Sequence, residues 1–111
     1  MKRIAMLNCR KADEVCAGAS CMSAFYDRRA SFAAYGSEEL CITAFMRCNG
    51  CAREHEEGLQ EKVERVIRIK TDVVHIGICA NSYKNGGECE NITRIASIFS
   101  DAGIEVVRGT H

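Results

Sequence analysis

Short apolar runs alternate with segments of helical periodicity along the chain, and this alternation restricts the fold more than any other feature of the sequence. The apolar runs have the length and continuous apolar character of strands buried on both faces, and they cover residues 4–7, 40–46, 73–78 and 104–107. The helical segments place apolar side chains three and four residues apart, and they cover residues 21–35, 53–70 and 88–102. Strands that alternate with such helices predict parallel strands joined by right-handed crossovers.

We therefore expect an α/β fold, a three-layer sandwich in which helices cover both faces of a four-stranded, mostly parallel sheet. The architecture is flavodoxin-like or Rossmann-like, and by analogy with flavodoxin-like sheets the expected strand order is 2-1-3-4. At 111 residues the chain has the length of one domain, so we expect a single domain over residues 1–111.

Charge and hydropathy exclude some classes of function. Fifteen basic and fifteen acidic side chains give a net charge of 0, which argues against a nucleic-acid or membrane surface reached by bulk electrostatics. The first apolar run is shorter than the roughly 7–15 residues of a secretory signal, and no stretch approaches the roughly 18 residues of a membrane span. We expect a cytoplasmic protein, in which thiols stay reduced.

Eight cysteines are the most unusual part of the composition. In a reducing compartment they are free thiols, metal ligands or redox groups rather than disulfides. Parallel strands end at one edge of their sheet, where α/β proteins bind ligands, and seven of the cysteines can reach that edge. The candidate metal ligands are these seven, together with the histidine that follows the last strand: Cys9, Cys16, Cys21, Cys48, Cys51, Cys79, Cys89 and His111.

The remaining cysteine, Cys41, lies at the opposite end of the second strand and is expected in the core, as is His75 in the middle of the third strand. The tightest local element is the C-x-x-C pair Cys48 and Cys51, a spacing that lets two sulfurs reach one ion. Helix N-termini point to the same edge and favour thiolate over thiol. Thiolate-rich surroundings select zinc, an iron–sulfur cluster, copper(I) or a thiophilic metalloid.

The strand-end cysteines, the central C-x-G-C and the terminal Gly109-Thr110-His111 together resemble the CGGC-domain proteins, over essentially the whole chain. The resemblance implies a small prokaryotic domain described as metal-binding, with zinc as the metal usually proposed. Asn49 stands where the family motif has glycine, and Glu88-Cys89-Glu90-Asn91 stands where the family often has proline and histidine around the cysteine. The resemblance implies a site but no established reaction.

Two functions stay open at this point. The first is a cysteine-rich protein that binds a zinc ion or an iron–sulfur cluster, in sensing, delivery or electron transfer. The alternative is a thiol–disulfide oxidoreductase in which Cys48 attacks and Cys51 resolves. The chain has no proline, and so lacks the cis-proline that thioredoxin-like proteins place opposite their C-x-x-C. The expected partners are a metal ion, cluster or metalloid, with no nucleic acid and no membrane, and the open sheet edges allow a homodimer.

Overall fold

The computed structural model describes residues 1–50, 56–82 and 87–111. In chain order its elements are β1 (Lys2–Asn8), the 3-10 turn η1 (Arg10–Ala12), α1 (Ala19–Asp27), the 3-10 helix η2 (Ala30–Tyr35), β2 (Leu40–Arg47), α2 (Glu56–Arg68), β3 (Val73–Ile76), the 3-10 turn η4 (Ile78–Ala80), β4 (Asn81–Ser82), β5 (Gly87–Glu88), α3 (Glu90–Asp101) and β6 (Glu105–Arg108). Residues 53–55 of the predicted second helix, and Cys51, lie outside the described residues.

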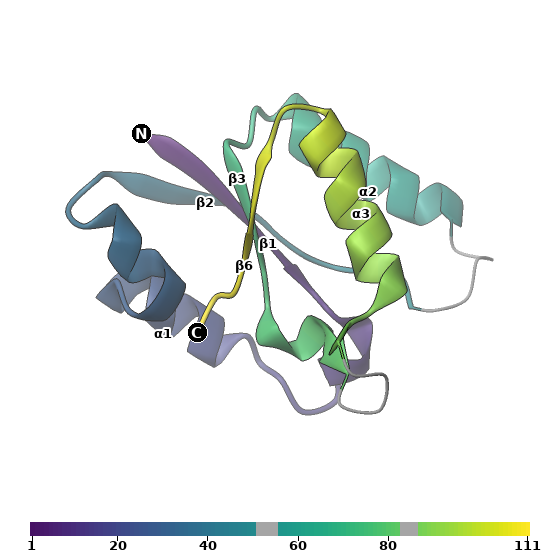
Figure 1. Ribbon diagram of the computed structural model, residues 1–111, viewed down its shortest axis with the longest axis horizontal. Coiled ribbons are helices and arrows are strands. Elements are labelled where there is room, and N and C mark those ends of the chain that lie inside the picture. The colour runs from purple at the N-terminus through teal and green to yellow at the C-terminus, as the bar shows by residue number, and fades with distance from the viewer. Residues whose placement is uncertain (51–55, 83–86) are drawn as a thin grey trace.

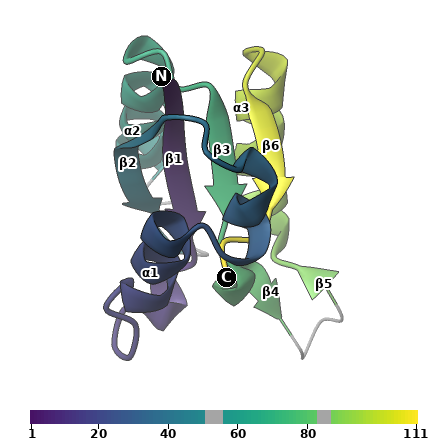
Figure 2. The ribbon, with the colours of Figure 1, turned by 90° about the vertical axis from the view of Figure 1, so that its left-hand side faces the viewer.

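Within the described residues, the main sheet has four parallel strands in the order β2-β1-β3-β6 (Figure 2). Counted along the chain, these strands lie in the order 2-1-3-4, so the predicted α/β class and strand order are confirmed. A short antiparallel hairpin, β4–β5, follows β3 and was not predicted. All strands of the main sheet therefore end at the same edge, which we call the carboxyl edge.

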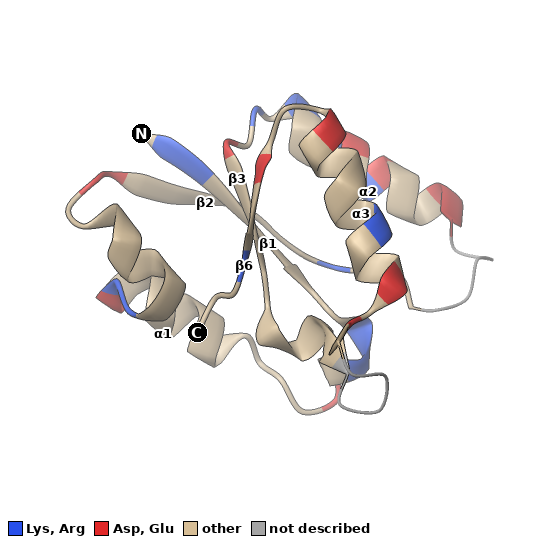
Figure 3. Cartoon of the chain, in the orientation of Figure 1, with Lys and Arg blue, Asp and Glu red and all other residues tan. Residues whose placement is uncertain are grey.

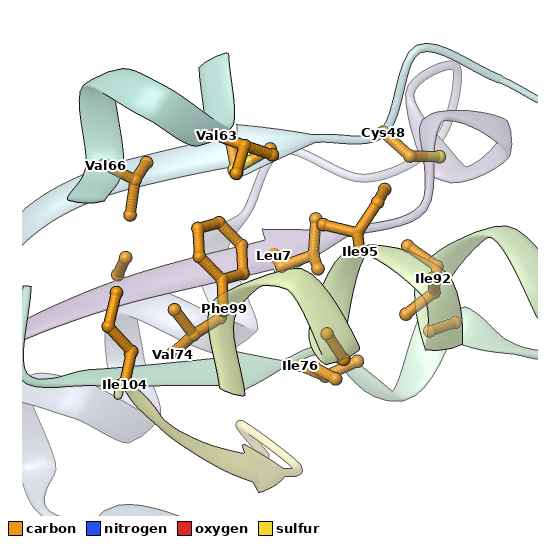
Figure 4. Close-up of a cluster of buried hydrophobic side chains, with 14 of the residues drawn as sticks. Leu7, Cys48, Val63, Val66, Val74, Ile76, Ile92, Ile95, Phe99 and Ile104 are labelled. Atoms are coloured by element: carbon orange, nitrogen blue, oxygen red, sulfur yellow. The ribbon is translucent and has the colours of Figure 1, made fainter. Parts of the chain in front are cut away.

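Helices cover both faces of this sheet, as the three-layer prediction requires (Figure 1). On one face, α2 and α3 bury Val63 and Phe99 against Leu7 of β1 (Figure 4). On the other face, α1 and η2 pack on Met6. Successive residues of β1 thus point into opposite cores, because side chains alternate along a strand. Each large apolar side chain buried in this way contributes about 1.5–3 kcal/mol.

The prediction of one continuous helix over residues 21–35 is wrong. The helix α1 ends early because Arg28 adopts a left-handed backbone with φ of 54°. The chain then resumes as η2, which carries Phe32 and Tyr35 over β3: the rings of Phe32 and His75 stack at 4.4 Å, and Tyr35 Oη lies 2.6 Å from His75 Nε2. These contacts offset the roughly 1–2 kcal/mol that a left-handed residue costs.

Two smaller predictions also differ from the structure. β3 ends at Ile76 rather than at residue 78, because the chain turns after Gly77 into η4, where Ala80 N–H bonds the Gly77 carbonyl at 3.1 Å. Cys41 is half-buried rather than part of the core, because β2 is an edge strand of the sheet. His75 is fully buried, as expected.

The surface of the described residues carries both signs of charge. Basic and acidic segments are interspersed over the helices rather than gathered by sign (Figure 3), in keeping with the net charge of 0. Within the described ranges, no helix is long and apolar enough to cross a membrane.

Candidate functional site

The carboxyl edge gathers cysteines because each of three neighbouring strands is followed by one within three residues. Cys9 follows β1, Cys48 follows β2, and Cys79 lies in the turn η4 after β3. Cys9 and Cys48 are 9% and 3% exposed, and Cys79 is half-buried. Cys48 also lies at the end of the apolar cluster under α2 and α3 (Figure 4). Cys9 and Cys48 are therefore shielded from water by the fold, and Cys79 is shielded in part.

Three successive backbone amides of the turn after β1 point at cysteine sulfurs. Cys9 N–H donates to Cys79 Sγ at 3.3 Å, and Arg10 N–H donates to Cys48 Sγ at 3.4 Å. The next amide, that of Lys11, hydrogen-bonds the thiol of Cys9. Runs of converging backbone N–H groups form the concavities that hold anions, including the sulfurs of iron–sulfur sites. This turn, which we call the amide turn (residues 9–11), favours negatively charged sulfur.

The thiols at this edge are close enough to influence one another electrostatically. The pKa of the Cys9 thiol is raised above its ordinary value, chiefly by burial; the N–H of Lys11 lowers it in part, and negative charge on Cys48, Cys79 or Cys89 raises it further. Cys89 is half-buried at the start of α3, and its N–H bonds the Ala80 carbonyl at 2.8 Å. Several thiolates so close together would repel one another unless a cation neutralised their charge. Metal binding and ionisation of the thiols are therefore coupled.

A second group of polar atoms lies around Cys21, on the α1 side of the sheet. Cys21 is 3% exposed, and its Sγ lies 3.1 Å from Thr110 Oγ1 and 3.9 Å from Asn8 Oδ1. The same Asn8 oxygen lies 3.5 Å from Cys79 Sγ. Burial raises the pKa of Cys21, the Thr110 hydroxyl lowers it, and charge on Cys16 or Cys79 raises it. Asn8 therefore links this group to the sulfurs at the ends of β1–β3.

Arg47 fixes the loop that carries Cys16. Its guanidinium donates to the carbonyls of Cys9 at 3.3 Å and Cys16 at 3.1 Å, and it pairs with Asp13 at 3.0 Å. The sulfur of Cys16 itself accepts from Gly18 N–H at 3.3 Å. The loop is therefore ordered by one half-buried cation, and it holds Cys16 within electrostatic range of Cys21.

The start of the C-x-x-C element is held by side chains from other elements. Lys62 Nζ of α2 donates to Asn49 Oδ1 at 2.6 Å, and Arg10 donates to the Asn49 carbonyl at 2.9 Å. Asn91 of α3 donates to the Gly50 carbonyl at 2.9 Å. Sequence reasoning missed Lys62 and Asn91. The sequence did contain one signal of this contact, Gly58 inside the periodic helical segment. A Cβ at position 58 would lie 3.1 Å from Asn49 Nδ2, so the glycine lets the helix that carries Lys62 pass close to the motif.

His75 holds the C-terminal segment in place by a hydrogen bond to Gly109. His75 Nδ1–H donates to the Gly109 carbonyl at 2.8 Å, so in the neutral ring Nε2 accepts from Tyr35 Oη. Burial lowers the pKa of His75, which keeps the ring neutral. Thr110, the next residue, is fully buried against Cys21, whereas His111 is exposed.

The structure thus brings Cys9, Cys48 and Cys79 to the amide turn, with Cys89 within electrostatic range. It groups Cys16 and Cys21 on the α1 side. Within residues 1–50, 56–82 and 87–111, no three side chains of Cys, His, Asp or Glu already stand in the geometry of a bound metal ion. The donor set fits a thiophilic metal in kind, since its members are thiols whose sulfurs accept hydrogen bonds from backbone amides.

Comparison with known proteins yields one relationship. No curated protein and no solved structure matches the chain. The family model of the CGGC domain matches residues 3–111, which is essentially the whole chain and includes every cysteine. The chain therefore belongs to the CGGC domain family.

Proposed function

We propose that this protein binds a soft or borderline metal ion, or a small iron–sulfur cluster, through thiolates at the carboxyl edge of its sheet. The observation that carries the proposal is the amide turn, in which consecutive N–H groups are directed at the sulfurs of Cys79, Cys48 and Cys9. Hydrogen bonds from amides stabilise thiolate, the form of cysteine that binds metal. Membership of the CGGC domain family supports a metal-binding role in general terms.

The ligands in this proposal are Cys9, Cys48 and Cys79, with Cys51 as the fourth. Cys51 lies outside the described residues, and its role rests on the C-x-x-C spacing, which lets it reach an ion held by Cys48. An all-sulfur set favours zinc or an iron–sulfur cluster over hard cations. When bound, zinc in four thiolates would stabilise the fold, whereas a cluster would carry an electron.

The chain's own residues supply the remaining requirements of such a site. The apolar cluster around Cys48 excludes water from its sulfur, and the amides of Cys9 and Arg10 orient two of the ligands. Lys62 and Asn91 hold the chain between the paired cysteines of the motif at its Asn49 and Gly50 positions. Hydrogen bonds of this kind around the ligands fix their orientation and commonly change metal affinity by about 10–100-fold when lost.

The thiol–disulfide oxidoreductase is the second candidate. It requires Cys48 to attack an external disulfide, and attacking thiols are at least partly exposed. Cys48 is only 3% exposed and packs with the apolar cluster. Burial of the attacking sulfur thus disfavours exchange chemistry relative to metal binding.

Purification without oxygen, followed by elemental analysis, assay of acid-labile sulfide and a visible spectrum, tests the proposal. Stoichiometric zinc in a colourless protein, or iron with sulfide in a brown protein, would support it and identify the bound group. The Cys79→Ser variant should then lose that group, because Cys79 lies at the amide turn. A metal-free wild-type protein with a reversible Cys48–Cys51 disulfide would instead favour the oxidoreductase.

A further inference from the structure

Two sulfurs from distant parts of the chain meet at the side chain of Asn8. The Oδ1 atom of Asn8 accepts from Cys79 Sγ of η4 at 3.5 Å and from Cys21 Sγ of α1 at 3.9 Å. The Asn8 backbone carbonyl also accepts from Cys48 N–H at 3.0 Å. Asn8 thus contacts residues from α1, η4 and the end of β2, and it is 2% exposed.

The fold leaves this carboxamide little freedom. A Cβ on Gly77 would collide with Asn8 Oδ1 and would lie 3.3 Å from Cys79 Sγ. Gly77 is held against β1 by its own N–H bond to the Leu7 carbonyl at 2.9 Å. The absence of a side chain at Gly77 is therefore what allows the Asn8 oxygen and the Cys79 sulfur to lie together.

Stability alone does not account for asparagine at this position. Within the described part of the chain, the Nδ2 atom of Asn8 is buried and has no hydrogen-bond partner. A buried donor without a partner destabilises a fold, whereas an apolar side chain of the same shape avoids that penalty. The unpartnered Nδ2 is thus a cost that asparagine at position 8 carries in the metal-free protein.

We propose that Asn8 is a positioning residue of the thiol site, which fixes the sulfurs of Cys79 and Cys21 and so makes Cys21 part of the same site. A carboxamide can hydrogen-bond these sulfurs both as thiols and as thiolates. Its oxygen accepts from thiols, and a half-turn of the amide would present Nδ2, which can donate one N–H to each of two thiolates. Neither an apolar side chain nor a carboxylate can do both. The identity of the metal or cluster that these sulfurs bind rests on the proposed function. The positioning of the two sulfurs by Asn8 does not depend on it.

The first arm of the test uses metal-free, reduced protein and needs no bound metal. The rate of alkylation by iodoacetamide at fixed pH is measured for each cysteine by mass spectrometry, in the wild type, Asn8→Leu and Asn8→Asp. Loss of the shared acceptor in Asn8→Leu should speed alkylation of Cys79 and Cys21 about fivefold. Asn8→Asp keeps an acceptor in place and adds a negative charge, so its rates should stay at or below those of the wild type.

Cys41 is the internal control for this arm, because it lies at the far end of β2 from Asn8. Its rate should be the same in all three proteins. Equal acceleration of Cys41, Cys79 and Cys21 in Asn8→Leu would mean general loosening of the fold and would overturn the positioning role. Unchanged rates at Cys79 and Cys21 would overturn it as well.

The second arm titrates the same proteins with Cd²⁺ and follows the sulfur-to-cadmium absorption band. Asn8→Leu should bind Cd²⁺ at least about tenfold more weakly than the wild type. A wild type that takes up no Cd²⁺, together with selective acceleration of Cys79 and Cys21, would contradict the proposed function and support the positioning role. Equal Cd²⁺ affinity and equal alkylation in wild type and Asn8→Leu would refute the positioning role while the proposed function stands.

Discussion

At the two ends of the main sheet, hydrogen-bond donors meet different kinds of acceptor. At the amino edge, Arg3 N–H donates to Asp72 Oδ2 at 2.8 Å, Arg3 Nε donates to the Ile69 carbonyl at 2.9 Å, and Lys2 pairs with Glu38 at 3.5 Å. At the carboxyl edge, the amides of the turn after β1 are directed at sulfurs instead. Oxygen is a strong acceptor and thiol sulfur is a weak one.

Under the proposed function, this difference separates a structural edge from the edge that binds the metal. At the amino edge, the hydrogen bonds of Arg3 end on the oxygen atoms of Asp72 and Ile69. Amides that meet only neutral thiols are poorly satisfied, and they become well satisfied when the sulfurs are thiolates. Under the proposed function, a bound cation holds the cysteines of the carboxyl edge as thiolates, so changes at the two edges should have different consequences.

The largest effect on stability is expected from Gly77→Ala. The added methyl group would collide with Asn8 Oδ1 and crowd Cys79, and overpacking of this kind costs about 1–3 kcal/mol. Urea unfolding of the reduced, metal-free protein measures the change. Gly87→Ala is the matched control, since a Cβ there meets nothing within 4 Å and should alter the free energy of unfolding by less than about 0.5 kcal/mol. Equal effects of the two substitutions would remove the evidence for a crowded carboxyl edge.

Lys62→Met should have the next largest effect. It removes hydrogen bonds from Nζ to Asn49 Oδ1 at 2.6 Å and to the Arg47 carbonyl at 3.0 Å, at a cost of about 1–2 kcal/mol. We also expect weaker binding of Cd²⁺, because the motif loses its anchor on α2. The exposed Lys70 offers the same substitution away from the site, and Lys70→Met should change neither quantity. Unaltered stability and Cd²⁺ affinity in Lys62→Met would show that the motif does not depend on α2.

Local patterns predicted the elements of this fold better than they predicted its contacts. Alternating apolar runs indicated the strands of the main sheet, and parallel strands place their ends together, so Cys9, Cys48 and Cys79 could be assigned to one edge from the sequence. The role of Asn8 could not, because its partner Cys79 is 71 residues away and only the register of β1 with β3 brings them together.

The break after α1 illustrates the same limit. The apolar spacing of residues 21–35 fits one helix, and nothing in that stretch resembles a stop signal before Gly36. The helix α1 instead ends at Asp27, with Arg28 as its C-cap, and the chain continues so that Phe32 and Tyr35 contact His75 on β3. These contacts join residues far apart in the sequence, so the local pattern could not predict them. The prediction that Cys41 lies in the core was wrong because the sequence pattern does not distinguish an edge strand from a central one.

At the amino edge, Asp72→Ala should destabilise the protein only slightly. The carboxylate accepts from the Arg3 amide at 2.8 Å, but the residue is exposed, so we expect a loss of about 0.5–1 kcal/mol in the free energy of unfolding. Metal content should equal that of the wild type, because the substitution lies at the end of β3 remote from the sulfurs. A loss of metal in Asp72→Ala would contradict the separation of the two edges.

The smallest effect is expected from pH through His75. Because burial lowers its pKa in the folded state, the unfolded chain takes up the proton first, and stability should fall as pH drops below about 6.5. The free energy of unfolding at pH 7.5 and pH 5.5 should therefore differ more in the wild type than in His75→Gln. An equal difference in the two proteins would mean that His75 is not held neutral by the fold.

The two cysteines at opposite ends of β2 give the most direct test of the central claim. Cys41 lies at the amino end, and Cys48 follows the carboxyl end and accepts from the Arg10 amide at 3.4 Å. Metal content per chain is measured for the wild type, Cys41→Ser and Cys48→Ser after identical anaerobic purification. We expect Cys41→Ser to retain the wild-type content and Cys48→Ser to lose most of it. Full metal content in Cys48→Ser, or an equal loss in both variants, would contradict a thiolate metal site at the carboxyl edge.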